Sequence, residues 1–174
     1  QILGAGSQGA VLVVDTGSRF GVSWFPRGAQ NPQWFVYADN SGTTAVSGAN
    51  TIVVLNGESF DTHNIFLSTS STYRVTPNLP GNYAFFASNQ LNAGDGVRWG
   101  VRIFKNGGTN IADNIVGQSG TAAETMGVFG IQSANGTTDY FDVRIFQESG
   151  SDKAASGTND TTWFYGFKLP MTGV

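Results

Sequence analysis

The sequence contains no cysteine, and it has few charged residues for its length. Without cysteine, disulfide bonds and thiolate metal sites are excluded, while the compartment is left open. Asp, Glu, Lys and Arg make up 12% of the 174 residues, about half of the usual share of roughly 25%. Only three Glu and three Lys occur, so the residues that build exposed helix faces are scarce.

Long apolar runs and basic clusters are also missing. No run approaches the ~20 residues that span a bilayer, so we predict no membrane insertion. The net charge is −3, and no electrostatic footprint for nucleic acid is visible. No signal peptide is apparent at the start. Because the chain begins at Gln1 rather than Met, we expect it to derive from a longer product.

Glycine and phenylalanine are abundant, with 24 and 13 copies. Glycine bends the chain between elements, whereas aromatic residues pack well on pleated strands. The length suffices for one domain with a real core. We therefore predict a mostly-β domain. Its low charge suggests that part of its surface is buried against other subunits.

Regular period-2 patterns begin at about residue 51. Val97, Trp99, Val101 and Ile103 fall on one face, and the pair Asn106-Gly107 that follows is a strong hairpin signal. Two further runs alternate in the same way: Phe141, Val143 and Ile145, and then Trp163, Tyr165, Phe167 and Leu169. Short strands at this spacing favour a sandwich or barrel. No fixed-period repeat is evident, which counts against a propeller or β-helix.

Residues 1–50 differ from the rest, with loose glycine-rich stretches and short apolar runs that end in turns. We interpret them as an extended N-terminal arm with short strands, followed by the main domain at 51–174. The arm is expected to lie on the main domain or on a neighbouring subunit. Trp24 and Trp34 are the predicted docking residues.

Three motifs in the main domain occur in a characteristic order. Pro80-Gly81-Asn82-Tyr83-Ala84-Phe85 opens an aromatic strand, Lys105-Asn106-Gly107 forms a turn, and Phe164-Tyr165-Gly166-Phe167-Lys168-Leu169 closes the domain. Together they resemble the signature of complement C1q-like and tumour-necrosis-factor-like domains. The resemblance implies an all-β jelly-roll sandwich that assembles as a homotrimer. Two departures are that Gly136 and Asp139 are not adjacent, and that no collagen-like stalk precedes the domain.

The arm carries a resemblance of its own. Gly9-Ala10-Val11-Leu12, Asp15-Thr16-Gly17 and Gly21-Val22-Ser23-Trp24 are similar to a short element of bacteriophage tail-fibre and other virion proteins. In those proteins the element precedes or links receptor-binding modules. The resemblance implies a phage virion as the location and other virion proteins as partners.

Neighbouring aromatic residues in the motif strands point to opposite faces. Phe85 and Phe86 form one such pair, and Phe164 and Tyr165 form another. One member of each pair is expected to fill the sandwich and the other to face a neighbouring subunit, because exposed aromatic faces are unfavourable. The predicted interface residues are Tyr83, Phe85, Tyr165 and Phe167. Alternatively, both faces are covered within one subunit, partly by the arm.

No constellation in the sequence indicates catalysis or metal binding. The single histidine, His63, lies close to Asp61, but no nucleophile-elbow sequence accompanies them. Glu58, Glu124 and Glu148 form no acid pair suited to a glycosidase. Gly94-Asp95-Gly96 lacks Walker and EF-hand spacing. Calcium held by scattered loop acids (Asp113, Asp152 and Asp160) is a weak alternative, and we predict no catalytic residue, metal or cofactor.

The sequence thus predicts a non-enzymatic virion structural protein, a trimeric jelly-roll module on a phage particle. Capsid decoration, a head fibre and a tail appendage all fit, with roles in assembly, particle stabilisation or attachment to a host-surface carbohydrate or receptor. The absence of an aromatic residue from Ser149 to Thr162 favours scaffolding over sugar binding. One alternative is a soluble lectin-like or cytokine-like module that recognises a carbohydrate or receptor. A polysaccharide-degrading hydrolase is a remote third class.

Overall fold

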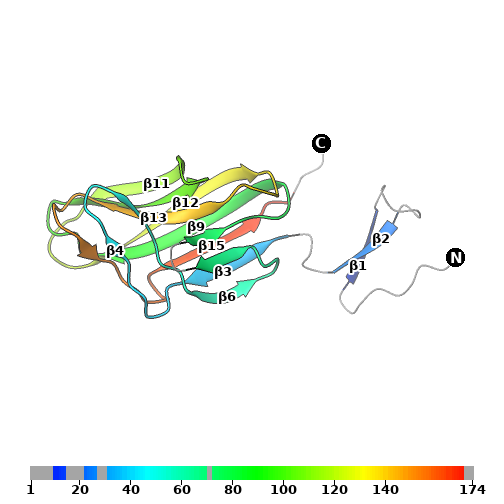
Figure 1. Ribbon diagram of the computed structural model, residues 1–174, viewed down its shortest axis with the longest axis horizontal. Coiled ribbons are helices and arrows are strands. Elements are labelled where there is room, and N and C mark those ends of the chain that lie inside the picture. Colours follow the sequence, from blue (N-terminus) through cyan, green and yellow to red (C-terminus); the bar gives the residue numbers. More distant parts are fainter. Residues whose placement is uncertain (1–9, 15–21, 27–30, 70–71, 171–174) are drawn as a thin grey trace.

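The structure, a computed structural model, describes residues 10–14, 22–26, 31–69 and 72–170. All regular elements in these ranges are strands, and two large antiparallel sheets face each other as a sandwich (Figure 1). The predicted all-β class is therefore confirmed. Within the same ranges no helix has the length and apolarity that a membrane crossing requires.

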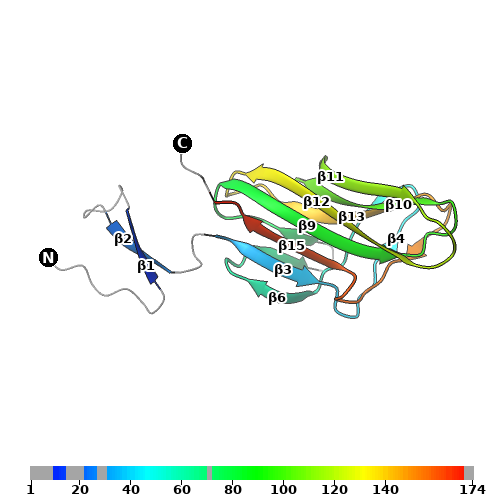
Figure 2. The same ribbon diagram turned by 180° about the vertical axis from the view of Figure 1, so that it is seen from behind.

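The first large sheet, here called the five-stranded sheet, forms one of the two layers of the sandwich, and its strands can be followed in both ribbon views (Figure 2). Its strands in spatial order are β12 (Glu124–Ala134), β9 (Gly81–Leu91), β15 (Trp163–Lys168), β3 (Gln33–Tyr37) and β6 (Gly57–Asp61). Neighbours in space are distant in sequence, so strands from both ends of the domain are brought together at its centre.

The second sheet, here the six-stranded sheet, forms the opposite layer. Its spatial order is β11 (Thr109–Gly117), β10 (Arg98–Lys105), β13 (Phe141–Gln147), β8 (Thr72–Val75) and β7 (Phe66–Thr69), with β5 (Asn50–Ile52) also paired to β13. Two small sheets add β4 (Thr44–Ala45) with β14 (Lys153–Ala154), and β1 (Ala10–Val14) with β2 (Val22–Pro26).

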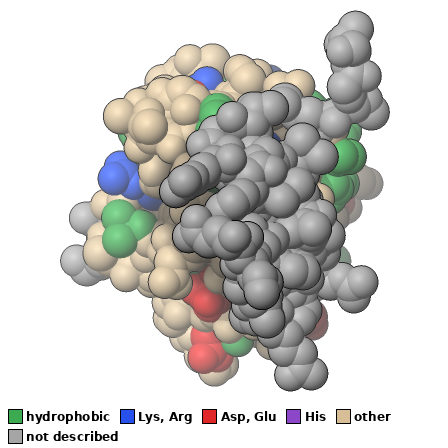
Figure 3. Space-filling view, turned by 90° about the vertical axis from the view of Figure 1, so that its right-hand side faces the viewer, with side chains coloured by type: hydrophobic (Ala, Val, Ile, Leu, Met, Phe, Trp, Pro, Cys, Tyr) green, Lys and Arg blue, Asp and Glu red, His purple; other side chains and the backbone are tan. Residues whose placement is uncertain are grey.

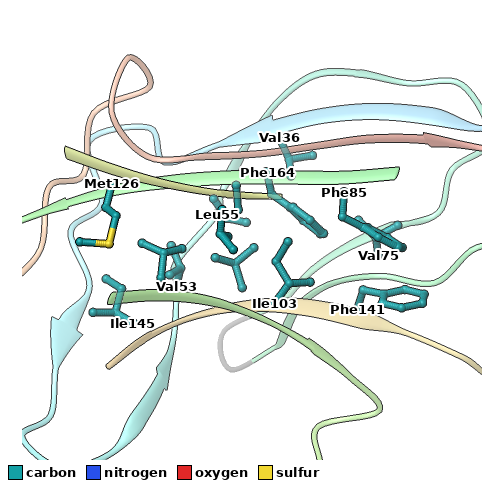
Figure 4. Packing of buried hydrophobic residues seen from close by; sticks show 14 of the residues in the cluster. Val36, Val53, Leu55, Val75, Phe85, Ile103, Met126, Phe141, Ile145 and Phe164 are labelled. Carbon is teal, nitrogen blue, oxygen red and sulfur yellow. The ribbon is translucent and has the colours of Figure 1, made fainter. Parts of the chain in front are cut away.

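The core consists of the inward rows of the two sheets (Figure 4). Phe85 and Phe164 extend from the five-stranded sheet toward Phe141 on the other layer, and all three side chains are fully buried. The ring centroids of Phe85 and Phe141 are 4.3 Å apart. Trp99, Val101 and Ile103 on β10 and Val143 and Ile145 on β13 are buried as their period-2 patterns predicted. The core therefore follows directly from the alternation along each strand.

The hairpin predicted between β10 and β11 is present. Asn106 and Gly107 have φ angles of 52° and 69°, the left-handed pair that a type I′ turn requires. The Asn106 side chain also accepts a hydrogen bond from the Tyr140 backbone N–H at 2.9 Å and donates one to Asp139 at 2.9 Å. Local backbone preference and side-chain hydrogen bonds thus fix the same turn.

The glycine of the closing motif has a packing role. Gly166 on β15 pairs with Trp34 on β3, and a Cβ atom at Gly166 would overlap the Trp34 indole ring. Trp34 is fully buried and contacts the rings of Phe85 and Phe164. The large and the small residue are therefore complementary partners across two strands.

This placement corrects the predicted boundary of the arm. Residues 33–37 form β3 inside the five-stranded sheet, and residues 44–52 contribute β4 and β5. The sandwich therefore begins at about residue 33 rather than 51. Trp34 lies in its core rather than on a docking segment, because β3 is hydrogen-bonded between β15 and β6. Trp24 lies in β2, and its side chain is outside what the structure describes.

The end-on view shows how the coloured charged side chains are distributed at one end of the molecule (Figure 3). In the end-on view, basic and acidic side chains occupy separate small groups among hydrophobic and neutral atoms (Figure 3). No broad field of one sign is visible in the part of this end that is coloured.

Candidate subunit interface

The outward face of the five-stranded sheet is covered with aromatic rings. Alternation along the strands directs one row of each strand to the core and the other row away from it. The outward rows carry eight aromatic residues, here called the aromatic face: Phe35, Tyr37, Phe60, Phe86, Phe129, Trp163, Tyr165 and Phe167. Each of the five strands contributes at least one ring.

Five of these rings form one row across the sheet. Phe129 pairs with Phe86, Phe86 with Tyr165, Tyr165 with Phe35, and Phe35 with Phe60. The successive ring centroids lie 4.8, 5.7, 6.3 and 6.3 Å apart. Directly opposed side chains are the closest pairs in an antiparallel sheet. The strand register therefore produces a continuous aromatic band from β12 to β6.

The aromatic face carries no charge on four of its five strands, β3, β9, β12 and β15. The outward positions of β3, β9, β12 and β15 hold aromatic, aliphatic, small or neutral polar residues only. Phe129 and Ile131 are each 53% exposed, and Phe60 is 39% exposed. Depletion of charge together with enrichment in aromatic residues is typical of the centre of a protein interface.

The face is hollowed between three of its rings. Phe86, Phe129 and Trp163 surround an open hollow of about 280 Å³, and Ala87, Gly127 and Val128 complete its lining. Gly127 leaves room there because it has no side chain. A hollow between large rings can receive a side chain from a second molecule. Such a fit gives the shape complementarity that is found at the centre of protein interfaces.

The structure separates the four predicted interface residues into two pairs. Tyr165 and Phe167 belong to the aromatic face, and their rings are 5.8 Å apart. Tyr83 and Phe85 are fully buried inside the subunit, so neither can contact another chain. This corrects the prediction for both residues. Their neighbours in the alternation face outward instead, and Phe86 is the member of its pair that reaches the aromatic face.

The buried Tyr83 has a structural role. Its hydroxyl donates a hydrogen bond to the Leu79 carbonyl oxygen at 2.7 Å. Burial raises the pKa of Tyr83 to about 12. The Pro-Gly-x-Tyr-x-Phe motif therefore ties the turn before β9 to the core.

Several residues of the aromatic face were not predicted. Phe35 and Phe60 were overlooked because the segments containing them were interpreted as arm and loop. Phe129 stands between Gly127 and Ile131 in an alternating row on β12, and that alternation was the available signal. Partners such as Phe60 and Phe35 could not be paired from sequence, because their register contains a bulge between Phe35 and Val36.

The acids and the histidine considered for catalysis have structural contacts. The Asp61 carboxylate accepts hydrogen bonds from the backbone N–H groups of Ile65 and Phe66 at 2.6 and 2.7 Å, and from that of His63 at 3.1 Å. The His63 Nδ1 atom lies 2.9 Å from the Thr62 hydroxyl. Asp61 therefore holds the turn after β6.

A second carboxylate closes the loop before β13. Asp139 forms an ion pair with Lys105 at 2.8 Å and accepts hydrogen bonds from Asn106 and the Asn135 backbone N–H. The hydrogen bond from Lys105 is the main reason that the pKa of Asp139 lies below its usual value. In the described ranges no three His, Asp or Glu side chains gather as a metal ion would require, and this includes Asp113, Asp152 and Asp160.

Comparison with known protein families and with curated proteins gives no match. Solved structures do match. Murine APRIL superposes with a TM-score of 0.61 at 14% identity, covering 80% of this chain and 99% of that chain. The globular domain of zebrafish complement 1qA gives 0.56 at 15% identity, covering 80% and 98%. Eiger TNF from S. frugiperda gives 0.54 at 12% identity, covering 83% and 96%. The predicted jelly roll is thereby confirmed, and the chain has the fold that TNF-like and C1q globular domains share.

Proposed function

We propose that the chain is a non-enzymatic module that assembles as a homotrimer through its aromatic face. The aromatic row that crosses all five strands carries this proposal, because it is uncharged and hollowed. In a single subunit its two end rings, Phe129 and Phe60, are exposed and the three rings between them are half-buried. An apolar patch of this extent on a soluble domain marks an interaction site. The sequence resemblance to C1q-like domains supports an assembly of three copies of the chain.

Light scattering on the native protein over a range of concentrations tests this assembly. The expected mass is three times the 18.4 kDa of one chain, unchanged on dilution into the micromolar range. A mass that stays at one chain would contradict the trimer. It would also mean that another molecule or the N-terminal segment covers the aromatic face.

The location that we propose for this trimer is a phage particle, where it serves in decoration, as a fibre or as a tail appendage. The support is the resemblance of residues 9–24 to a virion-protein element, which includes β1 and β2. These two strands pair as a hairpin in register from Ala10 with Pro26 to Val14 with Val22. A hairpin ahead of the sandwich suits a connection to a neighbouring virion protein.

Mass spectrometry of purified particles tests the location. Recovery of the chain in a constant ratio to a capsid or tail protein is expected, and its absence from intact particles would contradict the proposal.

The alternative is a free binding module, lectin-like or cytokine-like, that recognises a carbohydrate or receptor. The observation in its favour is that the solved structures of similar fold include murine APRIL, a zebrafish complement domain and a TNF protein. Binding of the isolated trimer to a glycan or receptor array, together with absence from particles, would support this alternative over the first.

A further inference from the structure

A cavity opens on the outer surface of the six-stranded sheet, where β13 changes partners. Phe141 at the start of β13 pairs with Val75 of β8, whereas Arg144 pairs with Ile52 of β5. Between these two partners lies a cavity of about 120 Å³. Thr72 and Arg74 of β8 line it on one side, and Tyr140, Asp142 and Arg144 line it on the other.

One of the two arginines already holds a carboxylate. The Arg144 Nε and Nη2 atoms donate to the two oxygens of Asp142, at 2.5 and 3.0 Å. The Arg144 guanidinium also lies over the Phe104 ring, 4.3 Å from its centroid. The arrangement is the bidentate pairing of a planar guanidinium with a planar carboxylate.

The other arginine has no such partner. The Arg74 guanidinium lies over the Tyr140 ring, 4.5 Å from its centroid, and forms no ion pair with a described residue. Its Nε atom is buried and has no hydrogen-bond acceptor among the described residues. A buried donor without an acceptor is unfavourable. Because this Nε atom is closed off from solvent, a ligand in the cavity would meet the terminal Nη1 and Nη2 atoms of Arg74, which have no hydrogen-bond partner among the described residues.

The surroundings of the cavity are positive. Arg102 lies directly opposite Arg144 on β10, and its guanidinium contacts the Asn50 side chain and the Phe146 ring rather than a carboxylate. Of the three arginines in this region, only Arg144 is paired with a carboxylate, Asp142, in a chain whose net charge is −3. Because Arg144 neutralises Asp142, Arg74 and Arg102 leave an excess positive charge beside the cavity.

We propose that this cavity binds the carboxylate group of a small acid or an acidic sugar, with the terminal Nη atoms of Arg74 as its partner. The planar fork of arginine matches a carboxylate in two hydrogen bonds. Thr72 also lines the cavity, and its hydroxyl is a further group that can donate a hydrogen bond. The volume is well below the roughly 300–1,000 Å³ that enclose a whole drug-sized ligand, so the cavity holds the charged group and the rest of the ligand lies outside.

This site is independent of the proposed assembly. All of its residues belong to one subunit and to the sheet opposite the aromatic face. Its test therefore gives the same answer whether the protein is a trimer or a monomer.

The experiment is a titration of the full chain, followed by amide NMR shifts, with acetate, glucuronate, glucose and sulfate as separate probes. Acetate and glucuronate are expected to give saturable shifts confined to residues 72–74 and 140–144, whereas glucose gives none. Tighter binding of glucuronate than of acetate assigns an acidic sugar, and equal binding assigns the bare carboxylate. Saturable binding of glucose there, or sulfate bound as tightly as acetate, would overturn the proposal.

Matched variants separate this site from a general charge effect. Arg74→Gln should weaken acetate binding about ten-fold or more, and Arg74→Lys should weaken it several-fold, because lysine keeps the charge without the fork. Arg98→Gln removes the same charge from the same sheet at a side chain that is 61% exposed, and it should change affinity less than about two-fold. Circular dichroism checks that each variant is folded. Unchanged binding in Arg74→Gln, or equal losses in Arg74→Gln and Arg98→Gln, would contradict the site.

Discussion

Phe104 and Phe129 both point away from the core, on opposite sheets of the same sandwich. Phe104 is only 7% exposed because the Arg144 guanidinium lies over its ring, whereas Phe129 is 53% exposed. The same contrast extends over both faces. Outward rings of the six-stranded sheet are covered by arginines of their own subunit, and those of the five-stranded sheet are not.

The difference indicates what each face meets. An arginine side chain can cover an aromatic ring with its aliphatic stem and guanidinium group while the charge stays near water. The outer surface of the six-stranded sheet is therefore suited to contact with solvent. The five-stranded sheet has no charged side chain on the outward rows of β3, β9, β12 and β15. Its rings are therefore suited to being covered by other subunits.

A charge placed on the aromatic face should have the largest effect. Phe129→Glu would bury an unpaired carboxylate in the proposed interface, and we expect dissociation to monomers, with affinity reduced by about a thousand-fold or more. Light scattering measures the mass. The control is Leu67→Glu, because Leu67 on β7 is 40% exposed on the other sheet. A trimer that survives Phe129→Glu as well as Leu67→Glu would contradict the assignment of the face.

The two neighbours Phe85 and Phe86 sharpen the comparison between the core and the face. In the Phe129→Glu background, where association does not contribute, Phe85→Ala should lower the free energy of unfolding by about 3–5 kcal/mol through loss of core packing. Phe86→Ala should lower it much less, because one side of this ring is free in the monomer. Urea unfolding measures both. Equal losses would mean that the core and face assignments do not hold.

The ion pair of Asp139 should have an intermediate effect that depends on pH. Asp139→Asn is expected to lower the free energy of unfolding by about 1–3 kcal/mol at pH 7, because charge-assisted hydrogen bonds from Lys105 and Asn106 are weakened. The folded pKa is lowered, so this contribution is present above the unfolded value of about 3.9 and is lost as the pH falls through the folded pKa. Denaturant unfolding at pH 7 and near pH 3 should show the difference between wild type and variant shrinking. A difference that grows in acid would contradict the stated sign.

The effect of salt concentration should also differ between the two faces, and it is the smallest effect that we expect. Raising sodium chloride from about 0.01 M to about 1 M shortens the Debye length from ~30 Å to ~3 Å. We expect the trimer mass to be unchanged, because the aromatic face is uncharged. Binding of acetate near Arg74 should weaken severalfold. Dissociation of the trimer in high salt would indicate that charges, rather than the aromatic row, hold the subunits together.

Much of the fold could be predicted from local patterns. The alternation of Trp99, Val101 and Ile103 determined one inward row, and Asn106-Gly107 determined a hairpin, since each depends on residues adjacent in sequence. The extent of the domain could not be predicted in the same way. β3 joins the sheet through β15, more than a hundred residues away, and the contact between Trp34 and Gly166 becomes visible only in three dimensions.

The candidate site was predicted in part for a related reason. Alternation showed that Phe85 and Phe86 face opposite ways but not which of them faces inward. That choice depends on the register of β9 with β12 and β15, which brings Phe86 between Phe129 and Tyr165. The cavity near Arg74 could not be predicted from the sequence, because its residues come from separate segments that meet only where β13 changes partners.

Hydroxyl-radical footprinting of the native protein tests most directly whether other copies of the chain cover the aromatic face. Modification of Trp163 and Tyr165 would be compared between the wild type and Phe129→Glu, with Leu67 on the opposite sheet as the internal reference. The account predicts that both aromatic residues are protected in the wild type and become reactive in the variant, while Leu67 reacts equally in both. Equal reactivity of Trp163 and Tyr165 in the two proteins would contradict it.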